Sequence, residues 1–141
     1  MSTPPNFTAS SALVIFGGGL GAWLRYLTSR LWMAVIGPVA ATAFPWATLT
    51  VNVTGSLAMG LLIGWMARHS PLPLGWSGEH WRLLLGVGVL GGYTTFSSFA
   101  LEFALFVERG NLALAALYVG TSLLAGFAAL FAGLAIMRVA A

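Results

Sequence analysis

The sequence predicts an all-α membrane protein whose single domain, residues 1–141, consists of four transmembrane helices. Only 6% of the 141 residues are charged and 59% are hydrophobic, and the mean hydropathy is +0.92. Soluble domains carry about 25% charged residues, because a surface that faces water must be hydrated. A chain with so few charges cannot cover itself with solvated side chains, so its main solvent must be lipid. Long stretches without charge, separated by turn-forming residues, supply the helices.

The positions of charged and turn-forming residues predict where the four helices begin and end. A helix needs about 20 apolar residues to cross the hydrocarbon core of a bilayer. No charged residue lies between Arg30 and Arg68, and Gly37-Pro38 divides that stretch. Pro, Gly and Ser are frequent in residues 68–80, and residues 108–111 read Glu-Arg-Gly-Asn; both segments favour turns. The predicted spans are about 11–36, 45–67, 81–107 and 112–137.

The arginines do not favour one orientation of the chain in the membrane. Four spans place Arg68, Arg82 and Arg138 on one side and Arg25, Arg30 and Arg109 on the other. The side with more Arg and Lys near the span ends normally stays in the cytoplasm, and here the two sides are equal. We therefore expect insertion in both orientations and assembly as an antiparallel, dual-topology homodimer. If one of these arginines is buried and does not count, a bias towards one orientation returns.

Several classes of function are excluded by the residues that the chain lacks. The net charge of +3 does not predict a nucleic-acid partner, because the arginines are scattered singly and form no basic stripe. The chain has no Cys and both histidines lie in one connector, so no thiolate metal site and no nucleophile–base–acid set is expected. Gly17, Gly19 and Ala22 match a dinucleotide-binding fingerprint, but they lie within a hydrophobic span and not after a strand. The chain is therefore not expected to be an enzyme.

Polar and small residues recur every four positions on three of the predicted helices. The three faces are Gly17, Gly21 and Arg25; Asn52, Ser56, Gly60 and Gly64; and Tyr118, Ser122 and Gly126. Small residues allow helices to pack closely in lipid, whereas hydroxyls and the Asn52 amide can line a polar path or bond a neighbouring helix. Arg25 can attract anions or extend to the headgroups, since arginine at membrane depth is costly. The sequence leaves these alternatives open.

The third span contains the most unusual segment, residues 91–99, which read Gly-Gly-Tyr-Thr-Thr-Phe-Ser-Ser-Phe. Glycine costs about 1 kcal/mol relative to alanine in a helix, so we expect a break near the middle of the membrane. Irregular backbone at that depth survives only where protein or a water cavity satisfies it, and its free carbonyls suit a small hard cation. The positive ring edges of Phe96 and Phe99, with nearby hydroxyls, can hold a dehydrated anion. Phe103 and Phe106 are expected to pack, and Glu102 is either structural or functional.

Three segments of the chain resemble the Fluc/CrcB family of fluoride channels. They are residues 18–26, 48–56 and 91–99, with the sequences GGLGAWLRY, TLTVNVTGS and GGYTTFSSF. The third segment is highly specific, and the resemblance covers nearly the whole chain with the same number and order of spans. It implies a fluoride-selective channel that exports F⁻ passively across the inner membrane and protects the cell from fluoride toxicity.

The resemblance also implies roles for particular residues. The dimer would have two pores, lined by Asn52, Phe96, Phe99, Ser97, Ser98, Tyr118 and Ser122, with Arg25 in the vestibule. The backbone carbonyls of Gly91 and Thr94 from both subunits would hold a structural Na⁺. The alternative function is a small proton-coupled multidrug exporter of dual topology. Proton coupling of that kind requires a carboxylate in an early span. This chain has Arg25 there, so Glu102 would have to carry the protons.

Overall fold

The computed structural model describes residues 4–69 and 73–139, which are almost entirely helical. The long helices are α1 (Phe7–Ala43), α2 (Trp46–Arg68), α5 (Phe96–Glu108) and α6 (Leu112–Val139). Between α2 and α5 the chain forms η1 (Pro73–Gly75), α3 (Gly78–Trp81), η2 (Arg82–Leu90) and α4 (Gly91–Tyr93). Residues 70–72, which belong to the predicted connector, lie outside the described residues.

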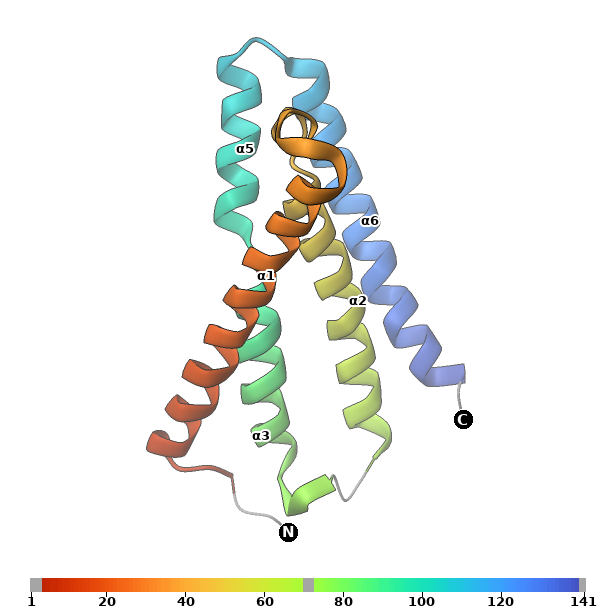
Figure 1. Ribbon diagram of the computed structural model, residues 1–141. Coiled ribbons are helices and arrows are strands. Elements are labelled where there is room, and N and C mark those ends of the chain that lie inside the picture. Colours follow the sequence, from red (N-terminus) through yellow and green to blue (C-terminus); the bar gives the residue numbers. More distant parts are fainter. Residues whose placement is uncertain (1–3, 70–72, 140–141) are drawn as a thin grey trace.

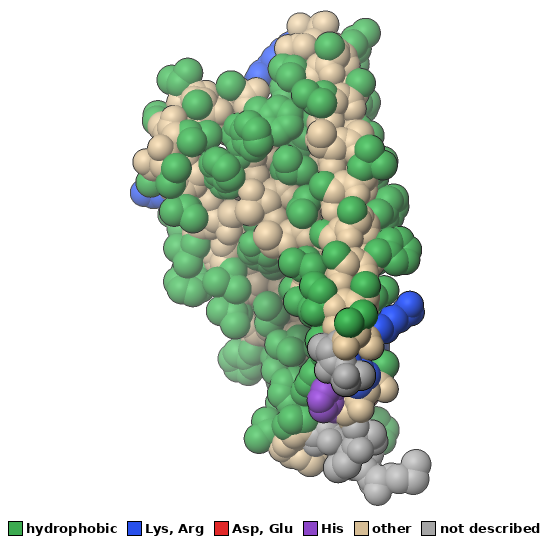
Figure 2. Space-filling model, turned by 90° about the vertical axis from the view of Figure 1, so that its right-hand side faces the viewer, with side chains coloured by type: hydrophobic (Ala, Val, Ile, Leu, Met, Phe, Trp, Pro, Cys, Tyr) green, Lys and Arg blue, Asp and Glu red, His purple; other side chains and the backbone are tan. Residues whose placement is uncertain are grey.

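Four helical segments are long and apolar enough to cross a membrane, as the sequence predicts. They are residues 7–43, 46–68, 78–108 and 112–139. Large hydrophobic side chains are exposed along them, among them Phe16, Leu124 and Phe131, and Figure 2 shows a face covered largely by hydrophobic side chains. Soluble monomers rarely expose such extensive apolar surface. The surface of this chain is therefore suited to contact with lipid.

The helices pack in two groups that meet at the centre of the molecule (Figure 1). α2 lies alongside α6, and α1 packs against η2 and α4. α5 and α6 are joined by a short turn at one end of the molecule, while the described ends of the chain lie towards the opposite end (Figure 1). The polar segment between α4 and α5 thus lies near the middle of the bundle, and not at either end.

Glycines allow these helices to approach to backbone contact. Gly133 of α6 lies against α2, and a Cβ at this position would lie only 2.8 Å from the backbone nitrogen of Leu61. Likewise, a Cβ on Gly17 of α1 would lie 3.0 Å from the Cα of Gly88 in η2. Close packing of small residues is a main source of helix association in lipid, where no hydrophobic effect drives helices together. The predicted small-residue seam of the second span is used in this way at Gly60, which packs against α6.

The turn between α5 and α6 closes with a glycine in the left-handed region. Gly110 has φ +71°, and its N–H donates to the carbonyl of Val107 (2.9 Å), while the N–H of Asn111 donates to that of Phe106 (2.9 Å). This pair of bonds is the Schellman motif, which satisfies the last carbonyls of a helix. The side chain of Asn111 then accepts from the N–H of Leu114 (3.4 Å) and begins α6. The Glu-Arg-Gly-Asn segment therefore forms the turn that the sequence predicts.

α1 extends beyond the end of the predicted first span. Gly37 lies within it at φ +79° and ψ 159°, which is not helical, so Pro38 begins a second helical piece that ends at Ala43. A residue before proline is disfavoured in the helical region, and glycine adopts a positive φ without steric cost. The predicted end near residue 36 thus corresponds to a kink and not to the end of helical structure.

The segment η2 is a π-helix, a feature that nothing in the sequence predicts. In it the N–H of Gly91 donates to the carbonyl of Gly86, five residues earlier. Gly86 and Gly88 are buried within it. π-Helical turns are rare, are usually single turns within α-helices, and often lie next to functional sites. Here the π-helix leads directly into α4 and the polar segment that follows.

We predict that Gly133→Ala destabilises the protein, because the added methyl group would force α2 and α6 apart. Overpacking of this kind costs about 1–3 kcal/mol, and thermal unfolding in detergent micelles would measure it. Gly120→Ala is the matched control on the same helix, since a Cβ there would meet no atom within 4 Å. Equal unfolding temperatures for the two variants would contradict the close contact between α2 and α6.

Candidate functional site

The candidate site is built around a two-residue interruption between α4 and α5. Thr94 (φ −79°, ψ 160°) and Thr95 (φ −152°, ψ 120°) both have extended backbone angles. The hydroxyl of Thr95 accepts from the N–H of Ser98 (3.2 Å) and so caps the start of α5. Extended backbone leaves the helical hydrogen-bond pattern, and at membrane depth each freed polar group needs another partner.

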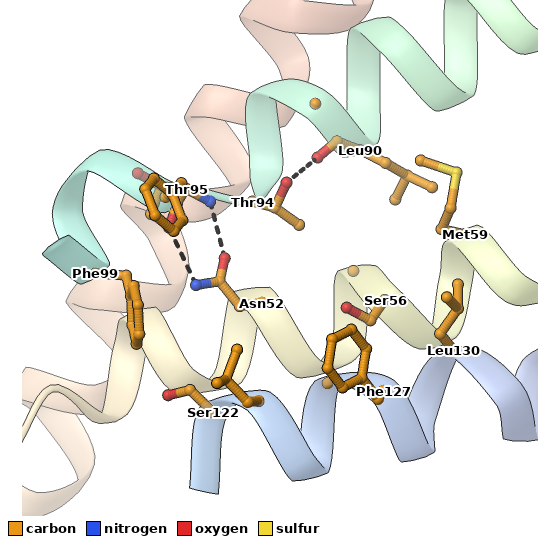
Figure 3. Close-up of a pocket in the computed structure, with 15 residues that line it drawn as sticks. Asn52, Ser56, Met59, Leu90, Thr94, Thr95, Phe99, Ser122, Phe127 and Leu130 are labelled. Atoms are coloured by element: carbon orange, nitrogen blue, oxygen red, sulfur yellow. Dashed lines mark hydrogen bonds between the residues drawn. The ribbon is translucent and has the colours of Figure 1, made fainter. Parts of the chain in front are cut away.

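Asn52 of α2 supplies that partner with both ends of its side-chain amide. Its Oδ1 accepts from the backbone N–H of Thr95 (2.8 Å), and its Nδ2 donates to the carbonyl of the same residue (3.1 Å). Figure 3 shows both bonds. The amide therefore binds Thr95 as a neighbouring β-strand would. Of the two interpretations that the sequence leaves open for Asn52, the structure shows the bond to a neighbouring span, at the extended residue Thr95.

Two backbone carbonyls lose their usual donors at the interruption. In a continuous helix the N–H of Thr95 would bond the carbonyl of Gly91, and that of Ser98 would bond the carbonyl of Thr94. Here Asn52 takes the first N–H and the Thr95 hydroxyl takes the second. Neutral carbonyl oxygens at the end of a helical segment suit a monovalent cation. The donor set fits Na⁺ in kind, but two oxygens from one chain do not complete a coordination shell.

A pocket of about 460 Å³ opens beside the interruption. Figure 3 shows it between the α4–α5 segment on one side and α2 with α6 on the other. Asn52, Phe96, Phe99 and Ser122 line it, as do Gly91 and Thr94. Phe96 is 79% exposed, so the pocket is open on its outer side. No charged side chain is among the described residues that line it.

The pocket presents hydrogen-bond donors and aromatic edges. The Asn52 amide carries two N–H groups, and only one of them is used on Thr95. The hydroxyl of Ser122 is buried and has no hydrogen-bond partner among the described residues. The rings of Phe96 and Phe99 lie 5.8 Å apart at an interplanar angle of 42°. Free donors and positive ring edges around an uncharged space favour a small anion.

Glu102 lies next to this pocket, in a cluster that the sequence does not predict. Its two carboxylate oxygens accept from the hydroxyls of Thr48 (2.7 Å) and Tyr118 (2.6 Å). Tyr118 is fully buried, and its ring lies 5.1 Å from that of Phe99. Short bonds from hydroxyl groups to a carboxylate are among the stronger hydrogen bonds. Thr48 carried no signal in the sequence, because a lone threonine is ordinary in a transmembrane helix.

The remaining predicted site residues lie outside the pocket lining. Ser97 and Ser98 bond the hydroxyl of Thr95, at 3.3 Å and 3.2 Å. Tyr118 donates its hydroxyl hydrogen to Glu102. Arg25, expected in a vestibule, donates through Nη1 to the carbonyl of Thr94 (3.3 Å). The single chain thus brings Asn52, Phe96, Phe99 and Ser122 into one pocket, while Ser97, Ser98, Tyr118 and Arg25 bond the groups around it.

Phe106 and Phe103 differ in their surroundings. Phe106 is 7% exposed and packs with Tyr118, Ala115 and Phe44, as predicted for a packing residue. Phe103 is 39% exposed and lies outside this cluster. The buried cluster surrounds the Tyr118 ring of α6, and the hydroxyl of Tyr118 bonds Glu102 of α5.

Comparison with known proteins gives consistent matches over most of the chain. Residues 12–134 match the family model described as CrcB-like protein, Camphor Resistance (CrcB). A protein of Novosphingobium aromaticivorans is 54% identical over 129 residues, covering 92% of this chain and 96% of its own length. One of Rhodospirillum centenum is 53% identical over 129 residues (90% and 94%), and one of Erythrobacter litoralis is 46% identical over 138 residues (98% and 98%). Each of these relatives carries the name fluoride-specific ion channel FluC.

We predict that Asn52→Leu destabilises the interruption, because it leaves the N–H and the carbonyl of Thr95 without partners. An unsatisfied buried polar group costs about 1–3 kcal/mol. Hydrogen exchange followed by mass spectrometry should show faster exchange in the peptide that contains Thr95. Ser56→Ala is the control on the same face of α2, since Ser56 lines the pocket without bonding Thr95. Unchanged exchange in Asn52→Leu would show that another group holds the segment.

Proposed function

Since the chain belongs to the CrcB family, we propose that it is a fluoride-specific ion channel, through which F⁻ leaves the cell passively and which thereby protects the cell from fluoride. The family match and the three relatives with the fluoride-channel name support this function. The chain is a multi-pass membrane protein with four helices able to span a bilayer, and in a bacterium it resides in the inner membrane. It is a channel and not an enzyme.

The pocket beside the interruption is the observation that carries this proposal. F⁻ is small and strongly hydrated, so a pore must replace its water with other donors. The free N–H of Asn52, the unpartnered hydroxyl of Ser122 and the edges of Phe96 and Phe99 provide such a lining. An uncharged lining can bind the ion strongly enough to replace water and still release it, which conduction requires.

The polar groups next to the pocket form the second part of the proposed path. Ser97, Ser98 and Tyr118 remain predicted pore residues, and each already bonds a neighbouring polar group in the single chain. Their hydroxyls can exchange such bonds for bonds to a passing ion, because a hydroxyl both donates and accepts. The proton-coupled exporter gains no support from the structure. Glu102 would carry its protons, and both of its oxygens accept hydroxyl hydrogens outside the pocket lining.

We further propose that the functional unit is an antiparallel homodimer that holds a Na⁺. A second protomer would cover the open side of the pocket and separate its polar lining, which includes Asn52 and Ser122, from lipid that offers no hydrogen-bond partner. The carbonyls of Gly91 and Thr94 from two copies would together surround the ion, which would tie the two interruptions to each other. Because Arg25 bonds the interruption, the arginines near the span ends number three on one side and two on the other, a difference small enough to be compatible with insertion in both orientations. An accessibility assay in which a terminal tag is reached from the same side in every copy would exclude the antiparallel arrangement.

We predict that liposomes containing the purified protein release F⁻ passively. A potassium ionophore would dissipate the voltage, and a fluoride electrode would follow the release. Vesicles loaded with Cl⁻ should retain it, and no proton gradient should be needed. Release of Cl⁻ at the same rate would contradict a fluoride-specific pore. Absence of F⁻ release from folded, dimeric protein would contradict the channel itself.

Phe96→Ile should reduce the F⁻ efflux rate at least tenfold while leaving the dimer intact, because isoleucine has no positive ring edge to replace water around the ion. A loss of about 1.4 kcal/mol of ion stabilisation corresponds to this factor. Phe131→Ile is the control, since Phe131 is a comparably exposed aromatic residue of α6 outside the pocket. Efflux at the wild-type rate in Phe96→Ile would remove Phe96 from the pore.

A further inference from the structure

Arg25 reaches the interruption because α1 packs closely against α4. Gly21 lies one helical turn before Arg25 on the same face of α1, and a Cβ on Gly21 would lie only 2.7 Å from the backbone nitrogen of Tyr93. Because Gly21 contacts Tyr93, the following turn of α1, which carries Arg25, lies beside Thr94. The guanidinium of Arg25 accordingly donates to the carbonyl of Thr94 (3.3 Å). Arg25 is therefore directed at the interruption by backbone contact between helices.

The carbonyl of Thr94 is available to Arg25 because its helical donor is engaged elsewhere. The N–H of Ser98 donates to the hydroxyl of Thr95. The carbonyl also lies at the C-terminal end of the helical run from Gly78 to Tyr93, where the aligned peptide dipoles favour a positive charge. A cation at this position is thus stabilised by the fold, whether it is a bound ion or a guanidinium.

No carboxylate neutralises Arg25 within the described residues. Among the described residues, the ion pair joins Arg82 and Glu79, at the end of η2 that is farther from the interruption. Glu102 accepts from Thr48 and Tyr118 instead. Arginine is always ionised, and a charge at membrane depth without a counter-ion is costly. The carbonyl at the interruption is therefore the group that Arg25 uses to lower this cost.

We propose that Arg25 acts as a tethered cation that occupies the Thr94 carbonyl in each protomer and competes with a bound Na⁺ for it. The inference rests on the Na⁺ site proposed above, and it assigns Arg25 a positioning role for the interruption in place of a fixed position in a vestibule. The guanidinium holds the carbonyl while the ion is absent. When Na⁺ takes the carbonyls of Gly91 and Thr94, electrostatic repulsion moves the guanidinium away, so that it becomes free to attract an anion.

Binding of radioactive ²²Na⁺ to the full-length protein in lipid nanodiscs tests this competition. Arg25→Gln removes the charge and keeps an N–H donor, and we expect its half-saturating Na⁺ concentration to fall at least tenfold. Like charges a few ångströms apart repel by more than this factor even at an effective dielectric constant of about 20. Arg25→Lys keeps one positive charge at neutral pH and therefore most of the repulsion, so its half-saturating Na⁺ concentration should stay within about threefold of wild type. Arg30→Gln is the control, because Arg30 is exposed and bonds Tyr26, so its Na⁺ affinity should not change.

A second measurement uses the wild-type protein and does not depend on the folding of a variant. Phenylglyoxal modifies accessible arginines, and mass spectrometry can follow Arg25 and Arg30 separately. Replacing choline with Na⁺ at constant ionic strength should raise the modification rate of Arg25 several-fold and leave that of Arg30 unchanged. An unchanged or lower rate at Arg25 would overturn the proposal, as would an unchanged or weaker Na⁺ affinity in Arg25→Gln.

These results can be separated from a failure of the proposed function. A wild-type protein that releases F⁻ from liposomes but binds no ²²Na⁺ would overturn the competition and leave fluoride conduction standing. If Arg25→Gln binds ²²Na⁺ more tightly but the wild-type protein releases no F⁻, the competition is supported and fluoride conduction is contradicted.

Discussion

The pairing of the Asn52 amide with the backbone of Thr95 is the interaction on which the candidate site depends. Hydrocarbon offers no hydrogen-bond partner, so an interrupted helix persists there only if protein groups replace the missing bonds. Asn52 replaces two of them at once. Since it takes the N–H that would otherwise bond Gly91, the same contact also frees a carbonyl. One amide side chain thereby creates both the extended segment and the oxygen-rich end of the helix before it.

Close helix packing fixes the position of that amide relative to the interruption. α2 is held against α6 through Gly60 and Gly133, and α1 is held against η2 through Gly17 and Gly88. Neither contact leaves room for a side chain, so a slide or rotation that replaced the glycine by a larger residue would force the helices apart. Rigid neighbours let a few polar groups keep a fixed geometry, which a pore that replaces an ion's water requires. The abundance of glycine in the chain therefore serves the site as well as the fold.

The sequence predicted the four apolar helices and the importance of residues 91–99, because charge depletion and adjacent glycines are local signals. It could not predict which hydrogen bonds those residues make. The bonds of Asn52 to Thr95, of Thr48 and Tyr118 to Glu102, and of Arg25 to Thr94 join positions at least 16 residues apart. Such pairs depend on how the helices rotate and slide against one another. Helical spacing placed Asn52 and Ser56 on one face of α2, but only packing determined that this face meets the interruption.

The π-helical register of residues 82–90 has a consequence for how the third span is analysed by mutation. A helical wheel drawn with 3.6 residues per turn assumes that positions four apart share a face. In a π-helix the hydrogen bonds join positions five apart, so the wheel assigns progressively wrong faces along this segment. A mutational scan of this segment that is interpreted with an α-helical period would assign lipid-facing and buried positions wrongly. Side chains in residues 82–90 should instead be grouped by their contacts, with Gly86 facing α2 and Gly88 facing α1.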